Sequence, residues 1–352
     1  MNGTIIKKNK ILNTPAIVDS TTYGDNSTAT GTYSSAYGSA SAATNNDSTA
    51  IGAKSLASGD GSTATGVESK ASTINSTATG FNATATGLTS TTYGAASKAS
   101  GQNSLALGYT TTASSLNSTA TGSYSNASGT RSTATGQGSN AAGDMSTAIG
   151  HGSNASNIYS TAIGSLSKAK NRITAIGTAI NASAYDSTSI GYNSIASEMY
   201  STTLGSESSA IAEGATIIGS HSSSNGEYSV IISTYASGSA FQGVALGNDT
   251  HVTDNFSVAL GCYSVTSPVV STSSMVISNI SYPVAGNLAG ATCSIGAKAD
   301  PNNGNPELKR TLTNLAAGRV DENSTDATNG SQLNAVIQAI NALNARLNAA
   351  GL

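Results

Sequence analysis

A glycine recurs every 14 residues through most of this chain. The series runs unbroken from Gly24 to Gly164, steps 13 residues to Gly177, and resumes the 14-residue interval to Gly261, with Ser233 as its one exception. It comprises 18 registers between residues 24 and 261. A fixed period of this length predicts a solenoid, in which each repeat forms one coil that stacks on the next.

Each repeat divides into two similar halves. Further glycines lie at half-register, as at Gly129 and Gly143, and each half reads roughly S-x-A-x-G followed by two turn residues. The pattern predicts two short strands per coil, joined by two tight turns in which glycine supplies the positive φ angle. Because side chains alternate along a strand, one alanine column should fill a thin interior where only a methyl group fits. This column consists of Ala29, Ala43, Ala57, Ala71, Ala85, Ala99, Ala113, Ala127, Ala141, Ala155, Ala169, Ala182, Ala196 and Ala210.

The residue before each register glycine marks a second face of the coil. This position exchanges Thr with Ile, Leu and Tyr, which is typical of positions that are covered. Since alanine already fills the interior, we expect this face to pack against another copy of the chain, as the core of an oligomer. Its clearest members are Ile149, Ile163, Ile176, Ile190, Leu204 and Ile218. The alternative is that the T-x-T halves present a plane of hydroxyls that binds ice or a mineral.

Composition argues against two classes of function. Charged residues make up 9% of the chain and its net charge is −3, so it lacks the basic footprint of a nucleic-acid-binding protein. No run of about 18 apolar residues is present, so we expect no membrane-spanning helix. Residues 1–20 read as an N-terminal arm or attachment segment, whose apolar part is too short and broken for a signal peptide.

Candidates for catalysis or metal binding are few. His151, His221 and His251 lie at different offsets from their register residues, so a nucleophile–histidine–acid arrangement would need side chains from distant coils. We therefore expect no enzyme activity, no cofactor and no metal site. The enzymatic alternative is a polysaccharide depolymerase with paired carboxylates, for which Asp47 and Asp60 on adjacent coils are candidates. Solvated turn residues are the simpler interpretation of both.

Two other groups of side chains stand out. Cys262 and Cys293 lie outside the repeat without metal-ligand spacing, which predicts two buried thiols. Lys168, Lys170 and Arg172 coincide with the 13-residue coil and form a candidate patch for an anionic ligand. If several copies of the chain assemble, such a patch would bind through avidity. The simpler interpretation is a solvated edge that keeps the solenoid soluble.

The sequence changes character after Gly261. Residues 262–311 form a transition, and the segment SPVVSTSSMVISNISYPV within it reads as strands that cap the open end of the solenoid. From Ser331 to the end at residue 352 the pattern is helical. Apolar residues spaced three and four apart form an a/d coiled-coil seam, made of Leu333, Val336, Ile340, Leu343 and Leu347.

The repeats and one further motif resemble a known family. The STAIG and S-x-A-x-G halves in 14-residue register resemble the Hep/Hag repeats of YadA-like trimeric autotransporter adhesin heads. Residues 312–336, LTNLAAGRVDENSTDATNGSQLNAV, resemble the neck motif of these proteins. The resemblance implies a homotrimer of left-handed parallel β-rolls spanning residues 21–261, joined by a neck at residues 312–330 to a trimeric coiled coil at residues 331–352.

The resemblance also implies a function. It implies a non-enzymatic fibre on the cell surface that attaches to a host surface or matrix ligand, either a protein or a glycan. Family members carry an export signal and a C-terminal membrane anchor, which this sequence does not show. The alternative is therefore a phage tail fibre, attached to a virion or anchor protein through the N-terminal arm or the C-terminal helix.

Overall fold

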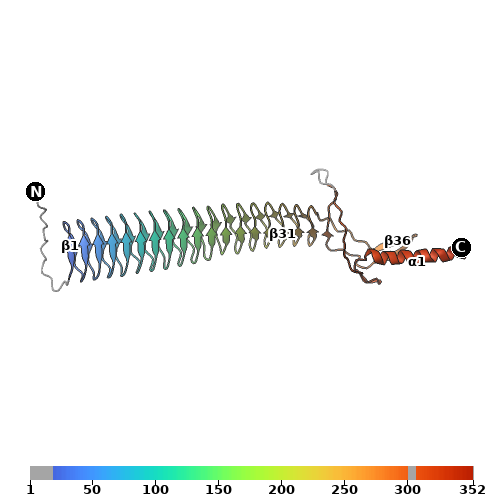
Figure 1. Cartoon of the computed structure of the whole chain (residues 1–352), viewed down its shortest axis with the longest axis horizontal. Coiled ribbons are helices and arrows are strands. Elements are labelled where there is room, and N and C mark those ends of the chain that lie inside the picture. Colours follow the sequence, from blue (N-terminus) through green and yellow to red (C-terminus); the bar gives the residue numbers. More distant parts are fainter. Residues whose placement is uncertain (1–18, 300–306, 352) are drawn as a thin grey trace. The chain divides into compact units, whose positions relative to one another are not determined.

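The computed structural model describes residues 19–299 and 307–351. It divides into two compact units, residues 1–225 and residues 226–352. All but two residues of the expected N-terminal arm lie outside the described ranges. Figure 1 shows the first unit as a series of coils, each built from two short strands.

The first unit contains a three-residue strand and a two-residue strand in each coil. The three-residue strands are β1 (Thr21–Tyr23), β3 (Ser35–Tyr37), β5 (Thr49–Ile51), β7 (Thr63–Thr65), β9 (Thr77–Thr79), β11 (Thr91–Tyr93), β13 (Leu105–Leu107), β15 (Thr119–Thr121), β17 (Thr133–Thr135), β19 (Thr147–Ile149), β21 (Thr161–Ile163), β23 (Thr174–Ile176), β25 (Thr188–Ile190), β27 (Thr202–Leu204) and β29 (Thr216–Ile218). The two-residue strands are β2 (Thr28–Ala29), β4 (Ala42–Ala43), β6 (Leu56–Ala57), β8 (Lys70–Ala71), β10 (Thr84–Ala85), β12 (Lys98–Ala99), β14 (Thr112–Ala113), β16 (Asn126–Ala127), β18 (Asn140–Ala141), β20 (Asn154–Ala155), β22 (Lys168–Ala169), β24 (Asn181–Ala182), β26 (Ile195–Ala196), β28 (Ser209–Ala210) and β30 (Ser223–Ser224).

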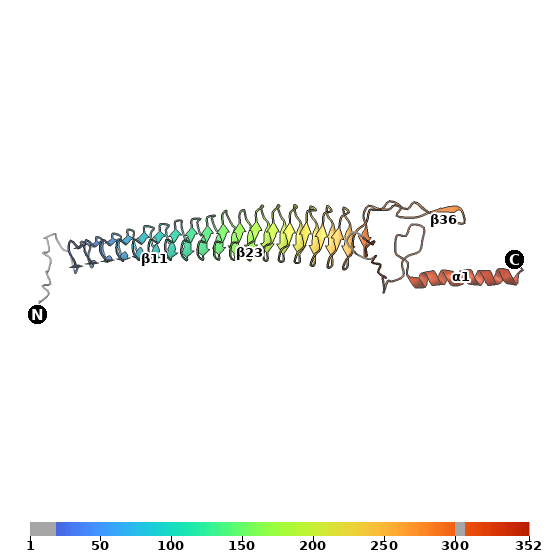
Figure 2. The same ribbon diagram turned by 90° about the horizontal axis from the view of Figure 1, so that it is seen from above.

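Equivalent strands of successive coils pair in parallel and in register. Ala148 of β19 lies opposite Ala162 of β21, and Ile149 lies opposite Ile163. The 13-residue coil keeps this register, since Ile163 lies opposite Ile176. The three-residue strands form one parallel sheet, which we call the long-strand sheet, and the two-residue strands form the other, the short-strand sheet (Figure 2). The predicted β-solenoid is confirmed.

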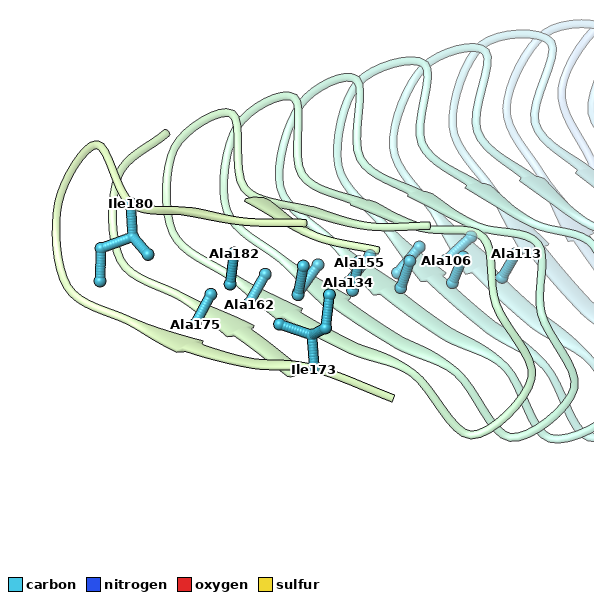
Figure 3. Packing of buried hydrophobic residues seen from close by; sticks show 14 of the residues in the cluster. Ala106, Ala113, Ala134, Ala155, Ala162, Ile173, Ala175, Ile180 and Ala182 are labelled. Carbon is cyan, nitrogen blue, oxygen red and sulfur yellow. The ribbon is translucent and has the colours of Figure 1, made fainter. Parts of the chain in front are cut away.

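The interior of the coil is as thin as the sequence predicts. The alanine column from Ala43 to Ala210 is fully buried, and a second alanine of the long-strand sheet faces it, as Ala175 faces Ala182 (Figure 3). Buried serines complete the interior, and many of their hydroxyls donate to the carbonyl three residues earlier, as Ser153 Oγ does to Gly150 O at 3.0 Å. The 13-residue coil instead buries Ile173 at a serine position, and Ile180 fills another in the next coil (Figure 3).

The two kinds of glycine have different roles, which corrects one expectation. The register glycine Gly150 has a φ of 126°, and a Cβ there would lie 2.6 Å from the backbone of Gly164. The half-register Gly143 has no positive φ, yet a Cβ there would lie 2.0 Å from the carbonyl of Asn157. Non-glycine residues such as Met145 and Tyr159 supply the left-handed conformation at this turn instead. Gly143 is needed for close approach of coils, not for its φ.

The second unit begins with further coils of the same kind. Their strands are β31 (Val230–Ile232), β32 (Ser237–Gly238), β33 (Val244–Leu246), β34 (His251–Val252) and β35 (Val258–Leu260). The expected cap strands are present as an antiparallel hairpin, β36 (Ser274–Ile277) with β37 (Ile280–Pro283). The strand that pairs with the edge strand β35 is a different one, β38 (Cys293–Ser294), so the hairpin does not supply this pairing as expected.

Both cysteines are exposed, so the prediction of buried thiols is wrong. Cys293 lies opposite Val258 in the ladder, whereas Ser294 lies opposite the buried Ala259. Alternation along the strand therefore turns Cys293 outward. Cys262 follows Gly261 directly and is likewise exposed.

The helix α1 (Gly330–Ala349) occupies the predicted helical segment. Asn329 is its N-cap, and a capping box joins Asn329 with Gln332. No helix in the described part of the chain is both long enough and apolar enough to cross a bilayer.

Candidate assembly and ligand-binding surfaces

The outward side of the long-strand sheet carries the column before the register glycines. Ile149, Leu204 and Ile218 are 39%, 45% and 41% exposed, respectively, although their alanine neighbours are fully buried. Ile163, Ile176 and Ile190 are partly buried on the same face. Within the described part of the chain, these in-register aliphatic side chains are therefore left partly or largely uncovered.

The proposed hydroxyl plane is short. Thr63 lies opposite Thr77 and Thr65 lies opposite Thr79, which gives two coils of paired threonines. In the next coil Tyr93 takes the place of the second threonine and is 64% exposed. An ordered plane of hydroxyls therefore does not extend along the sheet.

Lys168 and Lys170 flank the buried Ala169 on the opposite, short-strand sheet. Both are exposed, and Lys168 lies in register between Asn154 and Asn181. Because residues that flank an inward alanine point outward, the two lysines share one face of the coil. The structure thus brings together two members of the predicted patch.

Arg172 differs from these lysines, because it already has partners. Its Nε lies 3.2 Å from Asp186 Oδ1, its Nη1 donates to Tyr185 Oη at 2.9 Å, and its guanidinium lies 5.4 Å from the centre of the Tyr185 ring. The hydrogen bond that Arg172 donates to Tyr185, followed by the charge of Asp186, raises the pKa of Arg172. Arg172 is therefore a turn residue tied to the next coil, and its charge is largely compensated.

The neck folds back onto the start of α1. Gln332 Nε2 donates to Gly318 O at 2.6 Å, and Gly318 N donates to Gln332 Oε1 at 3.0 Å. Asn329 Nδ2 donates to Leu315 O at 3.0 Å. Amide side chains of the first turn thus fix the preceding loop, which explains why Asn and Gln occupy these positions of the motif.

The predicted coiled-coil seam is exposed along one side of α1. Leu333, Val336, Ile340, Leu343 and Leu347 are between 39% and 61% exposed, and no residue of the helix is buried. A helix of this length with an uncovered apolar stripe is marginal alone in water. An exposed apolar stripe with this spacing is typical of a coiled-coil helix.

The two acidic candidates for a depolymerase are exposed turn residues. Asp47 has a φ of 53° in its turn, and Asp60 lies in the equivalent turn of the next coil. Among the described residues neither takes part in an ion pair. Their placement agrees with solvated turn residues.

One chain of polar side chains escaped the sequence analysis. Ser237 Oγ lies 2.6 Å from His251 Nδ1, and His251 Nε2 lies 3.2 Å from Asp249 Oδ1. The expectation that such an arrangement needs distant coils is wrong, since Ser237 and His251 are 14 residues apart and therefore adjacent in one column. The backbone N–H groups of Ser237 and Ser239 are taken by Thr250 O and Val252 O, so they form no oxyanion hole.

Stacked 14-residue coils, an uncovered aliphatic face and a capped helix with an open seam define a repeat solenoid with a stalk segment. The YadA head domain repeat model matches residues 18–34, 29–55, 57–83, 99–125, 113–139, 127–150, 141–167, 182–208 and 239–261. The model for the coiled stalk of trimeric autotransporter adhesin matches residues 311–351. The head repeats cover more than half of the sequence, so the chain belongs to the YadA-like adhesin family.

Individual relatives match parts of the chain. Autotransporter adhesin BtaE of Brucella suis biovar 1 (strain 1330) is 48% identical over 77 residues, which span 22% of this chain and 9% of BtaE. The solved C-terminal YadA-like domain of a Burkholderia pseudomallei protein is 38% identical, covering 33% of this chain and 51% of that chain at a TM-score of 0.30. The collagen-binding domain of the Yersinia adhesin YadA is 24% identical, covering 63% of this chain and 84% of that chain at a TM-score of 0.27.

Proposed function

We propose that this chain is the subunit of a homotrimeric, non-enzymatic adhesive fibre that attaches a bacterial surface to a host surface or matrix ligand. The observation that carries the proposal is the uncovered aliphatic column on the long-strand sheet, from Ile149 to Ile218. An apolar face of this kind in a soluble repeat protein needs a partner, and a copy of the same chain offers the same face.

The C-terminal helix α1 also favours an assembly of three chains. Its a/d seam is exposed over its whole length, and the stalk model that matches residues 311–351 describes trimeric adhesins. We assign residues 21–261 to the head, residues 262–311 to a transition, residues 312–330 to the neck and residues 331–352 to the coiled coil. In the family these rolls are left-handed, and we extend that hand to this chain.

The relatives support a bacterial cell as the carrier of the fibre. The family models and BtaE all describe adhesins, which favours a bacterial surface. The tail-fibre alternative has no matching observation. The fibre binds its ligand without catalysing a reaction. Three copies of each binding surface provide avidity, which compensates for weak single contacts.

The test combines assembly with attachment. Sedimentation of the full chain should give a single trimeric species, and surface-coupled trimer should bind host cells or extracellular matrix. A chain truncated after residue 306 should lose both the trimer and most of the attachment. A full chain that sediments as a monomer, or a monomer that attaches as well as the trimer, would contradict the proposal.

A further inference from the structure

The outward face of the short-strand sheet in the first unit has an uneven distribution of charge. It consists of the residues that flank the buried residue of each two-residue strand, between Thr28 and Asn225. Four of these residues are lysines, Lys70, Lys98, Lys168 and Lys170, and all four are exposed. The two flanking columns contain no Asp, no Glu and no aromatic residue. We call this surface the lysine face.

Two cations in the turns of the first unit have acidic partners. Lys54 lies in a turn 3.4 Å from Glu68, and Arg172 lies in a turn beside Asp186. In the described part of the chain, none of the four lysines of the lysine face has a salt bridge. The acidic residues of this unit lie in the turns. Their negative charge is therefore near the turn cations, and the lysine face stays positive.

A ladder of amides ends at one of these lysines. Asn126 Nδ2 donates to Asn140 Oδ1 at 2.9 Å, and Asn140 Nδ2 donates to Asn154 Oδ1 at 3.2 Å. The next residue in the column is Lys168. The Nδ2 of Asn154 and the ammonium of Lys168 are both donors, so neither can satisfy the other. An anionic oxygen from outside the chain would satisfy both.

We propose that the lysine face binds a linear polyanionic glycan laid along the stack of coils. At about 4.8 Å per coil, Lys70 and Lys98 are roughly 10 Å apart and Lys98 and Lys168 roughly 24 Å apart. A small anion could contact one lysine, or at most the adjacent pair Lys168 and Lys170, whereas an extended chain of sulfates or carboxylates can contact lysines of several coils. Single-stranded nucleic acid fits less well, because its binding relies on aromatic stacking, which this face does not offer.

The inference rests on the proposed function in one respect. The long-strand and short-strand sheets are the two sides of one flattened coil, so covering the first in a trimer leaves the second free. Each trimer would then present three lysine faces. Because exposed ion pairs are individually weak, binding should depend on several lysines at once and on salt.

The experiment compares two triple variants of the full chain with the same change in net charge. One replaces Lys70, Lys98 and Lys168 by Thr, the residue found at Thr84 and Thr112 in the same column. The control replaces the turn cations Lys54, Arg131 and Arg172 by Ser. Binding to immobilised heparin, hyaluronan, uncharged dextran and single-stranded DNA of matched charge is measured over a salt series, after sedimentation has confirmed the trimer of each variant.

The wild type should bind heparin, hyaluronan or both, and not dextran. Heparin alone would assign the recognised group as sulfate, and binding to both would assign it as carboxylate or sulfate. The lysine-face variant should bind at least about tenfold more weakly with a shallower salt dependence, and the turn variant within about twofold of wild type. Equal losses in both variants, no binding to either polyanion, or tighter binding to single-stranded DNA of matched charge would overturn the inference. If such variants still form trimers that attach to cells, the proposed function stands without it.

Discussion

The guanidinium of Arg319 and the carboxylate of Asp326 are joined by two parallel hydrogen bonds, Nε to Oδ2 at 2.8 Å and Nη2 to Oδ1 at 3.1 Å. Arg319 N also donates to Asp326 Oδ2, at 3.1 Å. A single carboxylate therefore closes the neck loop through the side chain and the backbone of one arginine.

The first prediction concerns the thermal stability of the protein at low pH. The side-chain and backbone hydrogen bonds from Arg319 lower the pKa of Asp326 below its ordinary value. A carboxylate with a depressed pKa in the folded state contributes stability that is complete above its unfolded pKa, about 3.9, and is lost as the pH falls through the folded value. The thermal midpoint of wild type should therefore fall below about pH 4, and Asp326→Asn should remove part of that fall.

The control variant for this pH dependence is Glu322→Gln. It removes a carboxylate from the same loop and leaves the pair of Arg319 and Asp326 intact. Melting curves by circular dichroism from pH 7 to pH 2 compare the three proteins. An Asp326→Asn protein whose midpoint falls as steeply as that of wild type would show that the pair does not support the neck.

The second prediction places the aliphatic column in a trimer core. Ile163→Asp and Ile190→Asp should each bury an unpaired charge three times per trimer, at a cost of several kcal/mol per site. Asn140→Asp on the opposite sheet is the matched control and should leave assembly intact. Trimers of both isoleucine variants that melt like wild type would refute this placement.

The third prediction concerns the helix seam. Leu343 is half exposed in the single chain, so Leu343→Ala should cost almost nothing if the helix acts alone and about 2–5 kcal/mol if the seam is buried. Gln338→Ala, on the opposite side of the helix, should be neutral within about 0.5 kcal/mol. Concentration-dependent melting of the trimer measures both, and equal effects would argue against a buried seam.

The fourth prediction tests the thin interior with neighbouring residues. Ala141 is fully buried and Ala142 is exposed. Ala141→Val should force the two sheets apart and destabilise the head by about 1–3 kcal/mol or more, whereas Ala142→Val should have little effect. Chemical denaturation compares the unfolding midpoints of the two variants. Similar midpoints would mean that the interior has room for larger side chains.

Periodicity made the repeating part of this molecule predictable. Residues 14 apart are neighbours, so the buried column from Ala43 to Ala210 could be read directly. The same rule would have found the contact between Arg172 and Asp186 and the one between Ser237 and His251, had it been applied to polar columns as well as to alanine. Polar contacts of this kind lie between coils, so the order of charges along the chain does not indicate them.

The non-repeating part was less predictable, because no period relates its residues. That β38 and not the hairpin pairs with β35 depends on a return of the chain from Ser267 to Thr292, whose contact with Ser257 has no sequence signature. The exposure of Cys293 follows from that pairing. The roles of Asn329 and Gln332 in the neck are local, and the capping-box pattern could have revealed them.

The in-register pairing of Ile149 with Ile163 and of Ile163 with Ile176, across coils of different length, has a genetic consequence. A coil can be inserted or removed as a unit without disturbing any column, because its neighbours pair equally well with each other. Near-identical repeats such as the five copies of STATG provide homologous sites for unequal recombination within one gene. Populations that carry this gene should therefore differ in whole numbers of coils, each gain or loss changing the reach of the adhesin by about 4.8 Å.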